Sequence, residues 1–262
     1  MMKPRKSLGQ HFLKSKDALR KIIQAGQVSS DDVILEIGPG RGALTKQLLA
    51  FGCQVLAVEK DKELVQYLQE KFQNEIKSGK LKLIEDDILN FDFKTYNLEP
   101  RTYKLISNIP YNITGAILKK FLSSSVQPER MVLLVQKEVA ERIMGYGPRR
   151  KVGVNKESIL SISVKAYGEP KVIDRVPRRY FSPEPKVDSA IIAIKNISRE
   201  FFNRNDINEE KFWQIVKKGF AHKRKKLAGN LKNVIPDAVL AKYSDKRAED
   251  LTLDDWIGLV SN

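Results

Sequence analysis

The stretch Leu35-Glu36-Ile37-Gly38-Pro39-Gly40-Arg41-Gly42 decides the fold of this chain. An apolar run, Val33 to Ile37, leads directly into a G-x-G-x-G loop, and Ala43 to Phe51 follows with helical spacing until Gly52. Glycines after a strand let backbone N–H groups approach a ligand closely, and the N-terminus of the next helix favours an anionic group such as a carboxylate. The stretch therefore predicts the first strand, turn and helix of a nucleotide-binding α/β sheet.

Apolar runs and helical stretches go on alternating along the chain, which is typical of a parallel sheet with crossover helices. The predicted strands after the first are Gln54 to Val58, Leu81 to Ile84, Lys104 to Ser107 and Met131 to Gln136. Asp61 to Lys77 repeats large apolar residues at helical spacing, so we expect one helix there. Polar or acidic residues follow the strands, at the sheet edge where α/β proteins form their sites.

The last part of the chain has a different texture. Ser158 to Val164 and Val187 to Ile194 alternate or run apolar, and we expect them to form an antiparallel edge hairpin with a long loop. From Ser198 onward short helical patterns follow one another, and Thr252 to Asp255 resembles a capping box. We therefore expect a sheet domain over residues 1–197 and a small helical domain over 198–262.

Composition limits the function classes. The chain has 262 residues, of which 42% are hydrophobic, and a formal net charge of +15, which favours a polyanionic partner such as nucleic acid. No apolar run approaches the roughly 20 residues of a spanning helix, and the N-terminus has no apolar signal core, so we expect a cytoplasmic protein without a membrane partner. The single cysteine, Cys53, excludes an intramolecular disulfide, and with only His11 and His222 beside it we expect no metal site.

Basic residues are concentrated in two clusters with few acidic neighbours. Such uncompensated clusters are typical of surfaces that grip phosphates, although charge runs are also found on plain solvated faces. The N-terminal cluster contains Lys3, Arg5, Lys6, Lys14, Lys16, Arg20 and Lys21, and the C-terminal cluster contains Lys217, Lys218, Lys223, Arg224, Lys225 and Lys226.

The residues after the strands favour one kind of cofactor. The loop lacks a Gly-Lys-Ser/Thr sequence for a triphosphate, and Glu59, about 20 residues after it, can accept hydrogen bonds from a ribose diol, as in NAD enzymes. Asp87 ends the third strand, where it can accept from an adenine amino group, and the Asn108 motif ends the fourth. The combination favours a methyl-donating adenosyl cofactor over NAD.

The tetrapeptide Asn108-Ile109-Pro110-Tyr111 suits chemistry on an adenine amino group. That amino group is a poor nucleophile because its lone pair is delocalised into the ring. The side-chain oxygen of Asn108 and the main-chain carbonyl of Ile109 can accept both amino hydrogens and favour a more tetrahedral nitrogen. Pro110 stiffens the turn, and Tyr111 can stack on an extracted base. No general base is required before the methyl group transfers.

These motifs together resemble the KsgA-type small-subunit rRNA adenine dimethyltransferases. This family is a branch of the Rossmann-like, S-adenosylmethionine-dependent methyltransferases that also contains the Erm resistance methylases. The resemblance spans nearly the whole chain and rests on Gln10 to Leu13, Leu35 to Thr45, Glu59, Asp86 to Leu89, Asn108 to Tyr111, Gln136 to Arg142, Phe181 to Ser189 and Phe220 to Leu231.

The resemblance implies a set of site residues. The cofactor, S-adenosylmethionine, is expected to contact Gln10, His11, Leu13, Glu36, Gly38, Gly40, Glu59, Lys60, Asp87, Ile88 and Asn108. The target adenine is expected to contact Asn108, Ile109, Pro110 and Tyr111, with Phe181 as a second aromatic wall. An aromatic residue in a Phe-x-Pro-x-Pro segment is also commonly a hydrophobic plug, and that alternative stays open.

By resemblance, the enzyme dimethylates two adjacent adenines near the 3′ end of small-subunit rRNA in an assembling subunit, and acts as a monomer. Two features depart from the family: His11 stands where Asn is usual, and residues 146–162 differ from the usual loop and carry Arg149, Arg150 and Lys151. Three other functions stay open: Erm-like modification of large-subunit rRNA, a non-catalytic RNA-binding assembly factor, and a dehydrogenase.

Overall fold

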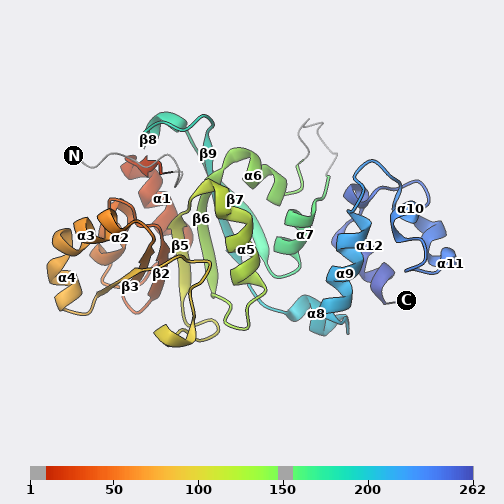
Figure 1. Ribbon diagram of the computed structural model, residues 1–262, viewed down its shortest axis with the longest axis horizontal. Coiled ribbons are helices and arrows are strands. Elements are labelled where there is room, and N and C mark those ends of the chain that lie inside the picture. The colour runs from red at the N-terminus through yellow and green to blue at the C-terminus, as the bar shows by residue number, and fades with distance from the viewer. Residues whose placement is uncertain (1–9, 147–155, 262) are drawn as a thin grey trace. The chain divides into compact units, whose positions relative to one another are not determined.

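The computed structural model describes residues 10–146 and 156–261, and a seven-stranded sheet organises its first part (Figure 1). The strand order is β4-β3-β2-β5-β6-β9-β7. Strands β2 to β6 pair in parallel, and β9 pairs antiparallel with β6. The strand bounds are β2 Val33–Ile37, β3 Gln54–Glu59, β4 Leu81–Glu85, β5 Lys104–Asn108, β6 Arg130–Gln136, β7 Glu169–Val176 and β9 Ser189–Lys195. The five strands predicted for the parallel sheet are confirmed, each to within one residue, and the α/β fold class with them.

Helices cover both faces of this sheet. Their bounds are α1 Lys16–Gly26, α2 Ala43–Ala50, α3 Lys62–Lys71, α4 Gln73–Lys77, α5 Thr114–Leu122 and α6 Lys137–Ile143. One buried cluster joins Ile22 of α1, Leu48 of α2 and Leu68 of α3 to alternate residues of the strands. Right-handed crossovers place α5 on the opposite face, because the strand order reverses between β4 and β5. In Figure 1, α5 crosses in front of the sheet.

The reversal of strand order creates the position for a site. From β2 the chain moves outward to β3 and β4, and it then returns to place β5 on the other side of β2. The loops that follow β2 and β5 therefore diverge at the carboxyl edge of the sheet, and in open α/β sheets ligands bind in the crevice that this leaves.

Two secondary-structure predictions were wrong. Residues 158–164 were expected to form a strand because polar and apolar residues alternate or run apolar there, but α7 spans Ile159–Lys165. A capping box explains the helix, because the side chains of Ser158 and Ser161 each accept from the other's backbone N–H. The helix expected over Asp61 to Lys77 is interrupted at Phe72, whose φ and ψ of −115° and 32° separate α3 from α4.

The expected edge hairpin is correct in one strand only. The strand expected over residues 187–194 is formed as β9, Ser189–Lys195, antiparallel to β6. Its neighbour at the sheet edge is β7, which the sequence analysis did not predict because of the charged residues in it. The sequence analysis also did not predict a second, two-stranded sheet, in which β1, Phe12–Leu13, pairs antiparallel with β8, Phe181–Ser182.

The chain divides into two compact units whose boundary differs from the expected one. The first contains Met1–Ala140 and Lys171–Ile197, and the second contains Glu141–Pro170 and Ser198–Asn262. Residues 141–170 therefore group with the helical domain expected over 198–262, not with the sheet domain expected over 1–197. A backbone hydrogen bond from Glu157 N–H to the Glu249 carbonyl and an ion pair of Lys156 with Asp250 hold this segment in the second unit.

Helices alone make up the described secondary structure from residue 198 onward. They are α8 Glu200–Arg204, α9 Glu209–Gly219, α10 Leu227–Leu231, α11 Asp237–Leu240 and α12 Leu253–Val260, and the predicted capping box begins α12. Short 3₁₀ turns complete the chain: η2 Lys94–Tyr96, η3 Tyr111–Ile113, η4 Arg178–Tyr180, η5 Ala241–Tyr243 and η6 Ala248–Asp250. Within the described ranges, no helix is both long and apolar enough to span a membrane.

Candidate active site

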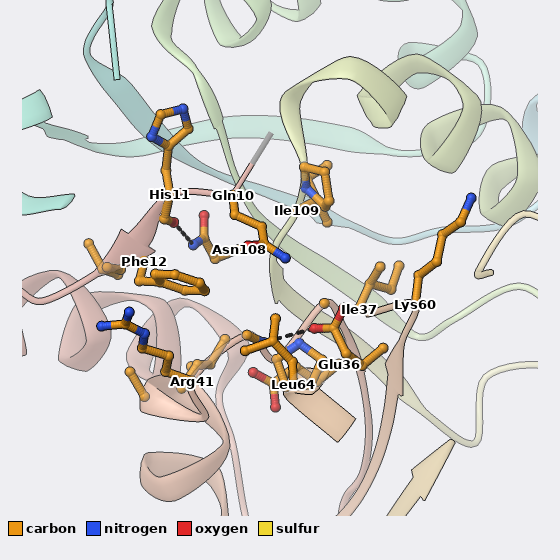
Figure 2. A pocket seen from close by; sticks show the side chains of 18 of the residues that line it. Gln10, His11, Phe12, Glu36, Ile37, Arg41, Lys60, Leu64, Asn108 and Ile109 are labelled. Carbon is orange, nitrogen blue, oxygen red and sulfur yellow. Dashed lines mark hydrogen bonds between the residues drawn. The ribbon is translucent and has the colours of Figure 1, made fainter. Parts of the chain in front are cut away.

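A cavity of about 320 Å³ lies at the carboxyl edge of β2, β3, β4 and β5. The loops after these strands line it, together with the segment around β1 and Ser182. Figure 2 shows Asn108 and Ile109 on one side of the cavity and Arg41, Leu64 and Glu36 on the other. Every residue predicted for the cofactor, and every residue predicted for the target base except Phe181, lines this one cavity.

The glycine loop forms one side of the cavity, and its backbone has the positive φ angles that glycine adopts most easily. Gly38 and Gly40 have φ of +61° and +58°, in the left-handed region. A Cβ atom on Gly40 would lie 3.0 Å from the ring of Phe12, so the ring can pack against the loop only because no side chain is present. Phe12 escaped the sequence analysis, as did Arg41, whose guanidinium lies 4.6 Å from the centre of the same ring.

Glu59 ends β3 with a nearly buried carboxylate whose orientation is fixed. One oxygen, Oε2, accepts from the Gly40 N–H at 3.1 Å, and the other, Oε1, accepts from the Asp61 N–H at 3.0 Å. Each carboxylate oxygen can accept a further hydrogen bond, which is what a ribose diol offers. Burial raises the pKa of Glu59 above its ordinary value, while the two backbone donors oppose that rise.

Asp87 follows β4 and presents a carboxylate that stays charged. Its Oδ2 accepts from the Lys60 ammonium at 2.8 Å, and its Oδ1 accepts from the Leu89 N–H at 3.0 Å. The hydrogen bond from Lys60 is the main reason that the pKa of Asp87 is lowered. Ile88 lies beside it and is buried, so the loop offers a carboxylate next to an apolar surface, which suits the amino edge and the ring of an adenine.

Glu36 is a second buried carboxyl group close to the glycine loop. Its Oε2 accepts from the Thr45 hydroxyl at 2.7 Å, and only 2% of the residue is exposed. Burial raises its pKa to about 8, and the nearby Glu59 carboxylate adds to the rise. The buried environment of the Glu36 carboxyl therefore favours its protonated, neutral form.

Replacing Glu36 with Gln is expected to change how stability depends on pH. A carboxyl group whose pKa rises on folding contributes fully below its unfolded pKa, near 4.5, and this contribution is lost as pH rises through about 8. Glu36→Gln keeps a neutral acceptor for Thr45, so it should be equal to the parent at pH 4 and more stable, by a few kcal/mol at most, at pH 9. Urea unfolding at the two pH values measures the difference. If the free energies of unfolding of Glu36→Gln and the parent differed by the same amount at both pH values, the raised pKa of Glu36 would be contradicted.

Asn108 ends β5 with an amide of defined orientation. Its Nδ2 donates to the His11 carbonyl at 3.2 Å, as Figure 2 shows. A carbonyl only accepts hydrogen bonds, so Nδ2 must be the atom bonded there and Oδ1 remains to accept. Ser107, one residue earlier, donates from its hydroxyl to the Ile37 carbonyl and ties the ends of β5 and β2 together.

Tyr111 follows Asn108 in the 3₁₀ turn η3, with its ring held at both ends. Its hydroxyl hydrogen-bonds to the Ser189 hydroxyl at 2.7 Å, and its ring stacks on that of His11, with centroids 5.7 Å apart and planes at 23°. His11 is held in turn, because its Nδ1 donates to the Pro183 carbonyl at 2.8 Å. The pair gives the cavity a flat aromatic surface next to Asn108.

The segment around β1 closes over the cavity through several hydrogen bonds. Gln10 donates from Nε2 to the Asp61 carboxylate at 2.8 Å, and Leu13 is buried where β1 pairs with β8. Asp61 was missed by the sequence analysis. It is the N-cap of α3, so the same carboxylate begins a helix and holds the segment that covers the site.

Phe181 does not lie where the sequence analysis placed it. The residue is 2% exposed, packs in the buried cluster with Leu13 and is not among the residues that line the cavity. Antiparallel pairing of β8 with β1 sets Phe181 opposite Leu13 and turns its neighbour Ser182 toward the cavity. In this structure Phe181 is therefore a hydrophobic plug beneath β1, and the expected second aromatic wall is not formed by it.

Comparison with known families identifies the chain. The family model described as ribosomal RNA adenine dimethylase matches residues 1–259. The chain belongs to this family. The ribosomal RNA small subunit methyltransferase A of Rippkaea orientalis is 40% identical over 274 residues, which cover 98% of this chain and 96% of that protein. The crystal structure of a dimethyladenosine transferase from Plasmodium falciparum superposes with a TM-score of 0.78 at 27% identity, covering 95% of this chain and 96% of that one.

The fold extends beyond the small-subunit branch. The crystal structure of the 23S rRNA methyltransferase ErmE superposes with a TM-score of 0.72, covering 95% of this chain and 98% of that one. At 24% identity this similarity shows the fold alone. The Rossmann-like methyltransferase sheet that the resemblance implies is therefore confirmed.

A ribosomal RNA adenine dimethylase uses S-adenosylmethionine, and the cavity fits that group. Its volume is within the range of small-molecule sites, roughly 300 to 1,000 Å³. Oriented carboxylates at the ends of β3 and β4 match a ribose diol and an adenine amino group, and Gly38 and Gly40 let the backbone of the loop come close to a ligand. Across residues 10–146 and 156–261, no group of three or more His, Cys, Asp or Glu is arranged to hold a metal ion.

The C-terminal basic cluster surrounds a turn with a defined backbone. Residues 221–226 are exposed and connect α9 to α10. Asn230 is 7% exposed and donates from Nδ2 to the carbonyls of Gly219 and His222, at 2.6 and 3.2 Å, which fixes the turn. Of the cluster, Lys226 is paired with Asp245. Lys3, Arg5 and Lys6 of the N-terminal cluster, and Arg149, Arg150 and Lys151, lie outside the described residues.

Proposed function

We propose that this protein transfers methyl groups from S-adenosylmethionine to the exocyclic nitrogens of two adjacent adenines near the 3′ end of small-subunit rRNA. The observation that carries the proposal is the fixed amide of Asn108. The His11 carbonyl occupies its donor, so its acceptor Oδ1 is available for an adenine amino group at the end of a cavity suited to the methyl donor. The names of the curated relatives support the small subunit as the substrate.

The proposed cofactor contacts follow the polar groups around the cavity. Glu59 accepts from the ribose hydroxyls, and Asp87 with Ile88 holds the adenine. Gly38 and Gly40 allow the methionine part to approach the backbone. The remaining predicted contacts, Gln10, His11, Leu13, Glu36, Lys60 and Asn108, all line the same cavity and complete the proposed set.

The protein contributes to the reaction by aligning the adenine nitrogen with the methyl group that is transferred. Bound S-adenosylmethionine supplies an electrophilic methyl group on a positively charged sulfur. The Asn108 side chain and the Ile109 carbonyl accept the two amino hydrogens and direct the nitrogen lone pair at that methyl group. Pro110 keeps the turn rigid, and Tyr111 stacks on the base, which offsets part of the cost of unstacking it from the RNA. The nitrogen releases its extra proton to water after transfer.

The RNA is proposed to bind partly through the exposed basic turn between α9 and α10. Its side chains surround a backbone that Asn230 fixes. The sequence from Lys217 to Lys226, which includes this turn, contains no acidic residue. Contacts of this kind hold the phosphate backbone in position without reading bases. Specificity is left to the shape of the structured RNA and to the base pocket.

Removing two of these charges should flatten the salt dependence of RNA binding. The variant Lys223→Ala with Lys225→Ala is expected to lower the slope of log K against log salt by about 1.4 to 1.8, because each lost phosphate contact removes about 0.7 to 0.9. The matched control is Lys77→Ala with Lys80→Ala, which removes two exposed lysines near the start of β4. Equal slopes for the two double variants would assign the basic turn to solvent.

Methyl transfer to isolated subunits tests the proposed function. The purified protein is incubated with labelled S-adenosylmethionine and, separately, with undermethylated small or large ribosomal subunits, and the label is mapped by nuclease digestion and mass spectrometry. Dimethyladenosine near the 3′ end of small-subunit rRNA is the expected product. Label in the large subunit would point to Erm-like activity, and no label despite tight RNA binding would point to an assembly factor. We also propose that the enzyme acts in the cytoplasm and that it is a monomer. Gel filtration with light scattering checks the oligomeric state.

A further inference from the structure

The loop that follows Asp87 is held by the side chain of Lys120, which does not line the cavity. Lys120, in the last turn of α5, donates from Nζ to the Leu89 carbonyl at 3.0 Å and to the Phe91 carbonyl at 2.8 Å. The same ammonium lies 5.6 Å from the centre of the Phe93 ring. It therefore joins a helix to a loop about thirty residues earlier through two charge-assisted hydrogen bonds, which are among the stronger kinds in proteins.

The two carbonyls belong to the turn that aims the Asp87 carboxylate. Asp87 accepts from the Asn90 N–H through its carbonyl, at 2.8 Å, and from the Leu89 N–H through its side chain, at 3.0 Å. Phe91 donates in turn to the Ile88 carbonyl at 3.3 Å. A shift of the Leu89 and Phe91 carbonyls would therefore move the carboxylate and the apolar side chain of Ile88 together.

Aromatic packing fixes the far end of the turn. Phe91 is 2% exposed and stacks on Tyr96, with centroids 4.9 Å apart, while Phe93 meets Phe121 of α5 edge to face at 5.4 Å. At the near end Ile88 is buried and the Asp87 carboxylate accepts from Lys60, but the Leu89 side chain is 37% exposed and packs little. Lys120 adds the hydrogen bond that holds the Leu89 carbonyl in place.

We propose that Lys120 is a positioning residue for the adenine of the cofactor: it holds the turn after β4 so that Asp87 meets the adenine amino group. The inference rests on the proposed function, since it assigns that adenine to Asp87 and Ile88. It also links the two substrates, because α5 begins directly after the Asn108 to Tyr111 turn and ends at the cofactor loop.

The test compares Lys120→Met with Lys119→Met, its exposed neighbour in the same helical turn. Both variants lose one positive charge, but only the first loses the two carbonyl contacts. We expect Lys120→Met to weaken S-adenosylhomocysteine binding about tenfold by calorimetry, with Lys119→Met within about twofold of the parent. Turnover at saturating S-adenosylmethionine should stay close to that of the parent, and Lys120→Arg should restore part of the affinity.

A second ligand separates aiming of Asp87 from general loosening of the fold. In the analogue of S-adenosylhomocysteine whose adenine amino group is replaced by hydrogen, Asp87 has nothing to accept from. The loss of affinity in Lys120→Met should therefore be several-fold smaller for this analogue than for S-adenosylhomocysteine, with only the contribution of Ile88 remaining. Equal losses for both ligands, or equal affinities of Lys120→Met and Lys119→Met, would overturn the role of Lys120. Failure of the parent to bind S-adenosylhomocysteine would instead overturn the proposed function, and the inference with it.

Discussion

Asn108→Ala is expected to lower kcat by at least about 100-fold while the Kd for S-adenosylhomocysteine changes by less than about threefold. In the proposed function the acceptor Oδ1 meets the amino group of the target adenine, and that contact strengthens as the nitrogen becomes tetrahedral and positively charged. Its loss therefore raises the barrier for transfer more than it weakens binding. In the proposed set of contacts Glu59 and Asp87 hold the ribose and the adenine of the cofactor, and the substitution leaves both in place. Single-turnover methylation of small subunits and calorimetry measure the two quantities.

Two further variants make the Asn108 result specific. Asn74→Ala changes an exposed asparagine of α4 that does not line the cavity, and it should leave turnover close to that of the parent. Asn108→Asp keeps an acceptor but cannot donate to the His11 carbonyl, which accepts from Asn108 at 3.2 Å, so it should also lose most turnover. Equal losses of turnover and cofactor affinity in Asn108→Ala would mean that the residue holds up β1 and does not act on the base.

The part of the site that could be predicted from the sequence is the part encoded by local patterns. An apolar strand followed by glycines, and a carboxylate or amide at the end of each later strand, fix positions along one sheet edge, because the ends of parallel strands meet there. Gly38, Glu59, Asp87 and Asn108 accordingly come together in one cavity although they span about seventy residues of chain.

The rest could not be predicted because it depends on partners that lie far away in the chain. Asp61 holds Gln10, and Lys120 holds the Leu89 carbonyl, and neither pair has a recognisable spacing. Phe181 belongs to this class too, since its pairing with Leu13 decides whether the ring points to the cavity or to the core. The strand expected over residues 158–164 failed for a different, local reason, because a capping box between Ser158 and Ser161 decided for a helix.

Phe181→Ala is expected to lower the free energy of unfolding by about 3 to 5 kcal/mol, because it leaves a cavity where a nearly buried phenyl ring packs among Leu13 and its neighbours. Phe181→Leu fills most of that space and should cost only about 1.5 kcal/mol. The control is Phe51→Ala, a phenylalanine that is 50% exposed, which should stay within about 0.5 kcal/mol of the parent. Urea unfolding at one pH measures all three. A loss for Phe181→Ala no larger than that for Phe51→Ala would contradict the buried placement.

The leucine variant also decides whether the ring has a second role. At a temperature where Phe181→Leu is fully folded, a ring that only supports β1 can be replaced without much loss of turnover, since leucine supplies similar apolar volume. A ring that turns to the cavity and stacks on the target adenine cannot be replaced, because base stacking on an aromatic ring contributes about 1 to 3 kcal/mol that leucine does not provide. Turnover close to that of the parent therefore assigns Phe181 to packing and leaves Tyr111 as the stacking residue. A tenfold or larger rise in the KM for RNA, with stability retained, restores Phe181 as the second wall of the base pocket.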